Sequence, residues 1–246
     1  MSALRLEDVS KHFGAIQALN NVSLTIEQGE VVGLMGDNGA GKSTLVKVIA
    51  GNFAPTGGAV YVADRKAEFH KPRDAQRAGI EVVYQDLALC DNLSAASNVF
   101  LGREPTRVFG PLRLVDYATM RSRSAQLFAR LKSETRPRDL VRRMSGGQRQ
   151  AVAIARTLLT DARIVLMDEP TAAISVRQVA EVLNLIRNLR NHGIAVVLIS
   201  HRMPDVFEVA DKIAVLRRGR LVASKRAADS SPEEVTGLIT GAIEAA

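Results

Sequence analysis

Apolar and polar positions recur along the chain with two periods, and together they predict strands interleaved with helices. Alternating segments near the amino terminus are typical of half-buried strands, at residues 4–9 and 22–26. A near-continuous apolar run at 31–35 suits a strand covered on both faces of a sheet, and buried strands are predicted at 164–167 and 194–200. A further strand is expected at 80–84. Further strands are expected at 59–63 and in a hairpin of 212–216 with 220–224. Helical spacing predicts helices at 45–50, 145–159, 176–191 and after Ser231.

The segment 86–144 differs from this α/β pattern. Its apolar residues fall at helical spacing, and prolines and glycines interrupt them, at Pro105, Gly110, Pro111 and Pro137. No strong strand is expected there. We therefore predict one domain over 1–246, with a core formed by 1–85 and 146–246 and a helical insert at 86–145.

A glycine-rich turn lies between the first buried strand and the following helix. A strand, a turn of this type and a Lys-Ser pair at a helix start predict a phosphate-binding loop. Glycines let consecutive backbone N–H groups turn inward, where they and the positive helix end surround phosphate oxygens. Lys42 is expected to contact the β- and γ-phosphates of a nucleotide, and Ser43 to bind Mg²⁺. The predicted loop comprises Gly36, Asp37, Asn38, Gly39, Ala40, Gly41, Lys42, Ser43 and Thr44.

Composition limits the class of protein. The formal net charge is +7 over 246 residues, which would suit nucleic acid or an anionic surface, but the basic residues are dispersed and no aromatic-rich basic strand accompanies them. The one cysteine, Cys90, excludes an internal disulfide and indicates a reducing compartment. No apolar run approaches the roughly 20 residues of a membrane span, and the amino terminus lacks the apolar segment of a signal peptide. We expect a soluble cytosolic protein, unless a partner holds it at a membrane.

Two acidic residues follow another buried strand. Asp168 ends the apolar run 164–167, and ligands of open α/β sheets bind at such carboxyl ends. A carboxylate there can hold Mg²⁺, directly or through water. Glu169 is then placed to orient or deprotonate the attacking water.

A second glycine turn opens the helix predicted at 145–159. Backbone N–H groups at this helix start make a second candidate anion site, formed by Ser145, Gly146, Gly147 and Gln148. One γ-phosphate does not need two such sites on one subunit. Two subunits arranged head to tail would let each turn cover the nucleotide of the other.

With these motifs in this order, nearly the whole chain resembles the nucleotide-binding subunits of ATP-binding-cassette proteins. The resemblance implies a P-loop NTPase core with a mainly parallel sheet, an antiparallel β portion near the amino terminus and an inserted helical subdomain. It implies ATP and Mg²⁺ as ligands, with ATP hydrolysis at the interface of a homodimer. Gln85 resembles the glutamine that senses Mg²⁺, His201 the switch histidine that contacts the γ-phosphate, and Phe13 the aromatic residue that stacks on adenine.

The chain departs from the family pattern at two positions. Met144 replaces the usual leucine before the Ser145–Gln148 signature, which nearly conserves volume. Ser175 ends the loop 171–175 where the family often has aspartate, and serine cannot supply that charge.

Within the family the chain is similar to ATPases of bacterial importers for ribose, xylose and fructose. The segments that carry this likeness are 83–87, 98–104 and 200–207. It implies three kinds of partner: a second copy of the chain, two membrane permease subunits and, indirectly, a periplasmic sugar-binding protein. The cytoplasmic face of the inner membrane would then be its place of action.

Two other interpretations are weaker. A soluble ATPase acting on DNA or ribosomes would suit the net charge, but chromosome and repair members insert long coiled coils, whereas only about 100 residues separate Thr44 from Ser145. Translation members usually carry two cassettes. A protein that binds ATP as a switch without hydrolysing it would not need Glu169 and His201, and both are present.

Overall fold

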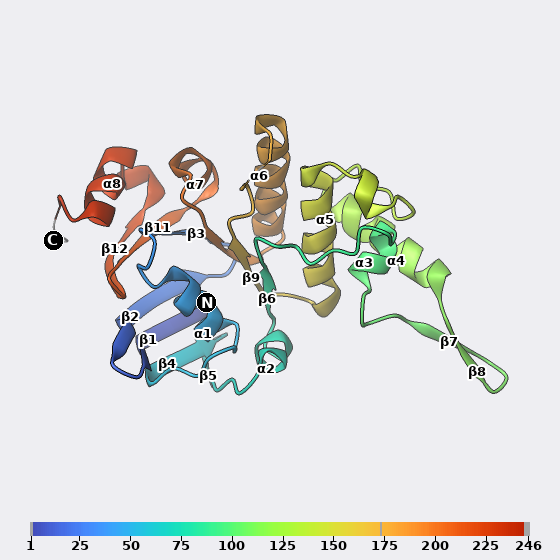
Figure 1. Cartoon of the computed structure of the whole chain (residues 1–246), viewed down its shortest axis with the longest axis horizontal. Coiled ribbons are helices and arrows are strands. Elements are labelled where there is room, and N and C mark those ends of the chain that lie inside the picture. The colour runs from blue at the N-terminus through green and yellow to red at the C-terminus, as the bar shows by residue number, and fades with distance from the viewer. Residues whose placement is uncertain (1, 173, 244–246) are drawn as a thin grey trace.

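The computed structural model describes residues 2–172 and 174–243, so that Met1, Ala173 and 244–246 lie outside the description. Figure 1 shows the order and arrangement of the elements. The strands are β1 (Ser2–Phe13), β2 (Ile16–Glu27), β3 (Val31–Met35), β4 (Gly57–Val62), β5 (Arg65–Ala67), β6 (Ile80–Val83), β7 (Thr106–Phe109), β8 (Leu112–Val115), β9 (Ile164–Asp168), β10 (Ala195–Ile199), β11 (Lys212–Arg217) and β12 (Arg220–Arg226). The α-helices are α1 (Lys42–Ile49), α2 (Pro72–Arg77), α3 (Ala95–Val99), α4 (Tyr117–Arg130), α5 (Gly146–Thr157), α6 (Val176–Asn191), α7 (Met203–Val209) and α8 (Pro232–Thr240).

A six-stranded sheet forms the centre of the molecule. Its strand order is β12-β11-β3-β10-β9-β6, and all neighbours pair in parallel except β11 with β12. The three strands predicted to be buried are β3, β9 and β10, and all three are parallel members of this sheet, which confirms the prediction. The strand predicted at 80–84 is β6. Because parallel strands share their direction, the carboxyl ends of β3, β9 and β10 meet at one edge.

Both faces of this sheet are covered, and successive residues of each strand enter different cores. In β3, Val31 and Met35 belong to the core packed under the helices, whereas Val32 and Leu34 belong to the core shared with the second sheet. That second sheet is antiparallel, with the order β2-β1-β4-β5. A strand buried on both faces has no polar side, which explains its continuous apolar pattern.

One glycine within a strand permits close packing of a helix. A β-carbon at Gly33 in β3 would lie 2.3 Å from Cγ1 of Val206 in α7. Glycine therefore lets α7 approach the sheet just behind the strand that leads into the phosphate-binding loop.

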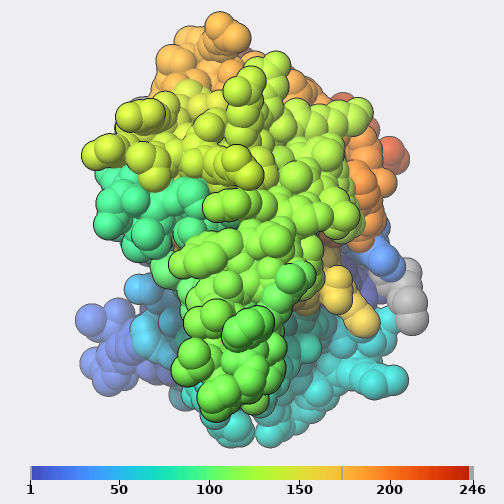
Figure 2. All heavy atoms as spheres, turned by 90° about the vertical axis from the view of Figure 1, so that its right-hand side faces the viewer, coloured from blue at the N-terminus to red at the C-terminus, as the bar shows by residue number. Residues whose placement is uncertain are grey.

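The insert contains a β-hairpin as well as helices. The insert contains helices α3 and α4, as its helical spacing predicts, and both pack against α5. The expectation that 86–144 holds no strand is wrong for β7 and β8, which pair from Thr106↔Val115 to Phe109↔Leu112. Gly110 and Pro111 form the two-residue loop of this hairpin, which protrudes at the right of Figure 1 and toward the viewer in Figure 2. Its strands expose side chains on both faces, so they lack the alternation that marks a half-buried strand.

Within the described residues, no helix combines the length and the apolar character that crossing a membrane requires.

Candidate nucleotide site

A cavity of about 970 Å³ lies at the sheet edge where β3, β9 and β10 end. The fold brings most of the predicted site residues to it from four separate segments. Those that line the cavity are Gly36, Asp37, Asn38, Gly39, Ala40, Gly41, Lys42, Ser43, Thr44, Gln85, Asp168, Glu169 and His201.

The phosphate-binding loop has the backbone that its glycines predict. Gly36, Gly39 and Gly41 have φ values of 154°, 77° and 105°, all of which are costly for a residue with a β-carbon. Gly41 also precedes the first turn of α1, and a β-carbon there would lie 2.8 Å from the carbonyl oxygen of Ala18. The loop therefore presents the amino end of α1 to the cavity, and this end favours an anion.

Lys42 folds back onto its own loop. Its Nζ donates hydrogen bonds to the carbonyl oxygens of Gly36 at 2.7 Å and Asp37 at 2.9 Å. Burial lowers the pKa of Lys42 below its ordinary value, and the nearby carboxylates of Glu169, Asp37 and Asp168 oppose this shift. The ammonium group is thus held at the mouth of the loop by groups that a phosphate could replace.

The carboxyl group of Asp168 lies at the end of β9. Burial raises the pKa of Asp168, as does the charge of Glu169, while Lys42 and Lys47 lower it. Two adjacent carboxylates attract a cation, and a bound cation would favour the ionised form of Asp168.

Glu169 occupies a strained position beside His201. Its φ of 50° lies in the left-handed region, and its N–H donates to the carbonyl oxygen of Ile199 at 2.9 Å. The backbone N–H of His201 donates to Oε1 of Glu169 at 3.1 Å. Nδ1 of His201 lies 2.9 Å from Oε2, although this buried oxygen has no hydrogen bond of good geometry. The bend after β9 and the end of β10 therefore fix the carboxylate at the cavity.

Several lining residues have no chemical signature in the sequence. Ile16, Gln17 and Ala18 come from the start of β2, and Arg218 and Gly219 from the turn between β11 and β12. Gly219 joins these segments because its N–H donates to the carbonyl oxygen of Ala40 at 2.9 Å, and its own carbonyl accepts from Asn20 at 2.8 Å. The sequence predicts the Arg218-Gly219 turn but contains no signal that it meets the phosphate-binding loop.

Phe13 does not line this cavity. Its ring packs edge-on against Phe53, with centroids 5.2 Å apart, and it remains 42% exposed. Phe13 pairs across the β1–β2 turn with Ile16, which does line the cavity. The ring is therefore a neighbour of the cavity lining, and its contact with adenine stays a prediction.

The signature residues lie away from the nucleotide cavity on the same chain. Ser145, Gly147 and Gln148 line a different cavity of about 750 Å³, bounded by α6. Ser145 caps α5 by accepting from the N–H of Gln148 at 3.2 Å, and the Gln148 side chain accepts from the N–H of Ser145 at 3.0 Å. Helix α5 therefore begins at its cap Ser145, as predicted, and its first turn lines the 750 Å³ cavity rather than the nucleotide cavity.

Both signature glycines also permit close packing. A β-carbon at Gly146 would lie 2.7 Å from Ile174, and one at Gly147 would lie 2.1 Å from the Glu181 carboxylate. Ser175, which replaces the family's aspartate, caps α6 through a reciprocal capping box with Gln178. The loop keeps its helix cap but not the charge, and Ala173 within it lies outside the described residues.

A buried side chain connects α5 to the loop after Glu169. Nε2 of Gln150 donates to the carbonyl oxygen of Pro170 at 2.8 Å, and Gln150 is 5% exposed. The helix that starts at the signature is therefore bonded directly to the segment that carries the two site carboxylates.

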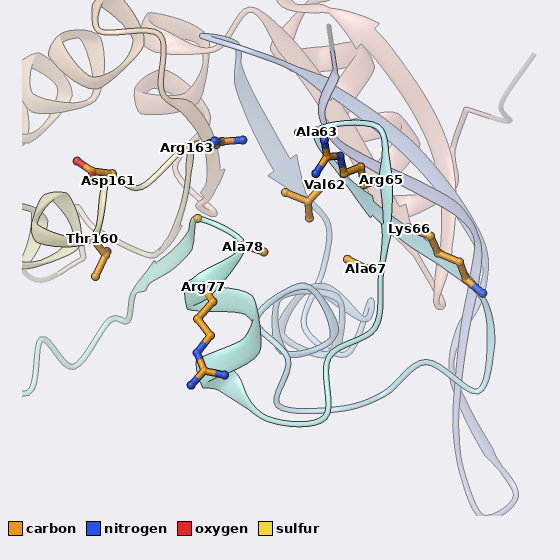
Figure 3. Close-up of a pocket in the computed structure, with 11 residues that line it drawn as sticks. Val62, Ala63, Arg65, Lys66, Ala67, Arg77, Ala78, Thr160, Asp161 and Arg163 are labelled. Atoms are coloured by element: carbon orange, nitrogen blue, oxygen red, sulfur yellow. The ribbon is translucent and has the colours of Figure 1, made fainter.

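Another cavity, of about 620 Å³, lies near the opposite end of the central sheet (Figure 3). Gly79 and Arg163, which line it, precede β6 and β9. Arg163 and Arg65 extend toward one another, while Lys66 and Arg77 extend away. No predicted site residue lines this cavity, so it is separate from the candidate nucleotide site.

Comparison with known proteins agrees with this geometry. Residues 19–172 match the family model described as "ABC transporter". The Xylose/arabinose import ATP-binding protein XylG of Sulfolobus acidocaldarius is 44% identical over 96% of this chain and 93% of its own length. The Ribose import ATP-binding protein RbsA of Geobacillus kaustophilus is 39% identical over 96% of this chain, which spans about half, 47%, of that longer protein.

Solved structures show the same fold. A nucleotide-free ATP-binding cassette from an ABC transporter superimposes with a TM-score of 0.82 at 26% identity, covering 98% of this chain and 96% of the other. A dimeric post-hydrolysis cassette bound to ADP and Pi gives 0.72 at 28% identity, covering 91% and 98%. The loop, the strand-end carboxylates and the matched region coincide, and the chain therefore belongs to the ABC transporter family as one of its ATP-binding cassettes.

Proposed function

We propose that this chain is the ATP-hydrolysing subunit of an importer for a monosaccharide. The observation that carries the proposal is the 44% identity to a xylose/arabinose import ATP-binding protein over nearly the full length of both chains. Relatives whose printed names specify ribose or galactose support the same substrate class at 38–45% identity.

ATP binding is assigned to the phosphate-binding loop. The glycine-rich backbone and the amino end of α1 are assigned to hold the phosphates, and Lys42 moves from the carbonyls of Gly36 and Asp37 to the β- and γ-phosphates. Gly219 fixes the loop from behind, so the anion site is largely formed before ATP arrives.

The residues of the cavity suit Mg²⁺ that arrives with ATP. In the described part of the chain, no group of three or more His, Cys, Asp or Glu side chains forms a metal cage. Mg²⁺ is usually held by one or two carboxylates together with substrate phosphates, and the carboxylate of Asp168 at the end of β9 meets that requirement. Ser43, Gln85 and Asp168 would hold the ion, which neutralises phosphate charge when bound.

Hydrolysis is assigned to Glu169 and the groups around it. Its carboxylate orients a water molecule and accepts a proton from it, while His201 holds Oε1 through its backbone and lies next to Oε2. We assign to the His201 ring a contact with the γ-phosphate, and to Gln85 the detection of Mg²⁺ at the start of the insert.

A homodimer completes the site. Ser145, Gly146, Gly147 and Gln148 form a capped helix start that is outside the chain's own nucleotide cavity, so we assign it to the ATP bound by a second copy. A related cassette has been solved as a dimer with ADP and Pi, which supports this arrangement.

Transport requires further subunits. We propose that two permease subunits at the cytoplasmic face of the membrane bind this dimer, and that a sugar-binding protein delivers the substrate. ATP binding closes the dimer and hydrolysis lets it open. These movements make the permease open alternately to the two sides of the membrane.

Uptake of labelled sugars by cells lacking this chain tests the proposal. We expect uptake of one monosaccharide to fall to background, and to return with the wild-type chain but not with Lys42→Ala. Pentoses and hexoses should be tested in parallel. Unchanged uptake of every monosaccharide after deletion would exclude the sugar-import role.

Phe13 offers a test of base recognition. Aromatic stacking on a base is worth about 1–3 kcal/mol, so Phe13→Ala should weaken ATP binding by about tenfold. Phe53→Ala is the matched control, because it removes the packing partner of Phe13 but not the proposed stack. Equilibrium binding of a fluorescent ATP analogue measures both. An unchanged dissociation constant for Phe13→Ala would show that the ring serves only the Phe53 contact.

A further inference from the structure

The β7–β8 hairpin concentrates exposed apolar surface. Six of the twelve large apolar side chains that are exposed in the described part of the chain lie within residues 108–117. They are Val108, Phe109, Leu112, Leu114, Val115 and Tyr117, and Phe109 is 75% exposed. A contiguous patch of this kind on a soluble surface usually marks an interaction site.

The hairpin has no face packed against the body of the protein. Val108 and Val115 lie on one face, and Phe109, Leu112 and Leu114 on the other, yet every residue of both strands is exposed. A two-stranded hairpin of this length is marginally stable alone in water. Figure 2 shows it as the lobe nearest the viewer, beneath the rest of the insert.

The base of the hairpin is nevertheless firmly held. The N–H of Asp116 donates to the carbonyl oxygen of Pro105 at 2.8 Å, and its carboxylate pairs with Nε of Arg107 at 2.5 Å. The same carboxylate caps α4 by accepting from the N–H of Thr119 at 3.0 Å. These contacts lower the pKa of Asp116, chiefly through the bonds from Thr119, so the support persists over the physiological pH range. The hairpin therefore projects from the insert but is fixed at its base to α4.

The charges of the hairpin and of helix α4, which follows it, are mostly positive. The segment 106–130 has five arginines and one acidic residue, Asp116, which is already paired with Arg107. Arg113 in β8 and Arg121 in α4 have no ionic partner among residues 2–172 and 174–243, and both are exposed. Long arginine side chains can keep their charge in the headgroup layer while apolar neighbours lie deeper.

We propose that the β7–β8 hairpin binds the surface of an anionic lipid bilayer and inserts its tip at the boundary between headgroups and acyl chains. A protein groove would cover one face of the ribbon, whereas a lipid interface surrounds both apolar faces. The Gly110-Pro111 loop carries no charge that would resist entry. Insertion is shallow, because the outer strand edges keep unpaired backbone groups that need water.

This inference rests on the proposed function only in requiring that the protein works beside a membrane. The hairpin would then hold the helical insert at the bilayer independently of nucleotide. It adds a contact with lipid to the proposed contact with permease subunits.

The absence of tryptophan from the chain provides a clean test. Phe109→Trp places the only such fluorophore at the tip, and Val176→Trp, at a position 83% exposed in α6, is the matched control. Full-length protein without nucleotide is mixed with phosphatidylcholine vesicles, with or without phosphatidylglycerol. We expect a blue shift and quenching by headgroup-proximal spin-labelled lipid for the Phe109→Trp protein, mainly with anionic vesicles, and neither change for the control.

Vesicle sedimentation separates the apolar and ionic contributions. We expect Phe109→Ser combined with Leu112→Ser to weaken partitioning by about tenfold or more. Arg113→Gln should weaken it by about fivefold on anionic vesicles only. Thermal unfolding should be unchanged, because these side chains pack against nothing in the body of the protein.

Three results would overturn the proposal. They are an identical emission spectrum for the Phe109→Trp protein with and without vesicles, partitioning that ignores the hairpin substitutions, and a shift seen only when purified permease in detergent is added. The last result would assign the hairpin to a protein partner. Unchanged uptake of every monosaccharide after deletion of this chain, together with intact vesicle binding, would instead count against the proposed substrate class alone.

Discussion

Glu169→Gln is expected to reduce ATP hydrolysis by about 100-fold or more while ATP binding is retained. A general base contributes about 10²–10⁴ to the rate, and the amide cannot accept a proton from water. The substitution keeps the shape of the side chain and an oxygen that can accept from the N–H of His201. Phosphate release and equilibrium ATP binding, measured on the same preparation, distinguish loss of chemistry from loss of the site.

The stalled protein also tests the shared site. Ultracentrifugation of Glu169→Gln should show a dimer with ATP and a monomer with ADP or without nucleotide. Adding Ser145→Arg should prevent the dimer but preserve ATP binding, because Ser145 lies outside the nucleotide cavity of its own chain. A monomer under all three conditions, even at high protein concentration, would contradict the proposed dimer.

Lys42→Ala is expected to weaken ATP binding by at least about 30-fold and to remove measurable turnover. Removing one partner of a desolvated charge pair costs about 2–5 kcal/mol, and the pKa of Lys42 shows that burial already opposes its charge. The substitution also removes two hydrogen bonds to the loop carbonyls. Isothermal titration with ATP and a steady-state ATPase assay measure the two effects.

Lys47→Ala is the matched control for this prediction. Lys47 lies on the same helix but does not line the nucleotide cavity. Its removal should change the dissociation constant by less than about threefold, since it interacts with the site only at a distance. Full ATPase activity in Lys42→Ala would contradict the assignment of the cavity.

The central strands could be predicted because each is buried on both faces, as β3 is from Val31 to Met35. Strands that contain both buried and exposed residues are harder to predict in full. The sequence predicts the inner parts of β1 and β2, but these strands continue to Phe13 and from Ile16, where exposed residues break the alternation. The sequence does not predict the hairpin of β7 and β8, because its apolar residues cover no core and leave no alternating pattern.

The residues of the candidate site also fall into two groups: those that a local sequence pattern predicts and those that only the fold brings to the cavity. The phosphate-binding loop and the Asp168-Glu169 pair each carry their chemistry in consecutive residues, and the loop upstream gives the acidic pair its interpretation as part of a nucleotide site. Gln17 and Arg218 reach the cavity only because the β11–β12 turn packs on the loop through Gly219. That contact joins residues about 180 positions apart by backbone hydrogen bonds, for which side-chain identity leaves no pattern.

The hydrogen bond from Gln150 to Pro170 has a consequence for how the two ATP molecules of a dimer affect each other. In the proposed dimer, the first turn of α5 contacts the nucleotide of the partner. Gln150, on the same helix, donates a hydrogen bond to the carbonyl of Pro170, next to the chain's own Glu169. Each subunit would thus sense both nucleotides through one rigid helix. Coupling free energies are reciprocal, so the factor by which ATP at one site changes the affinity of the other is the same in both directions. Favourable coupling through α5 would make the binding curves of the stalled dimer sigmoidal, and the buried amide of Gln150 would contribute to their steepness.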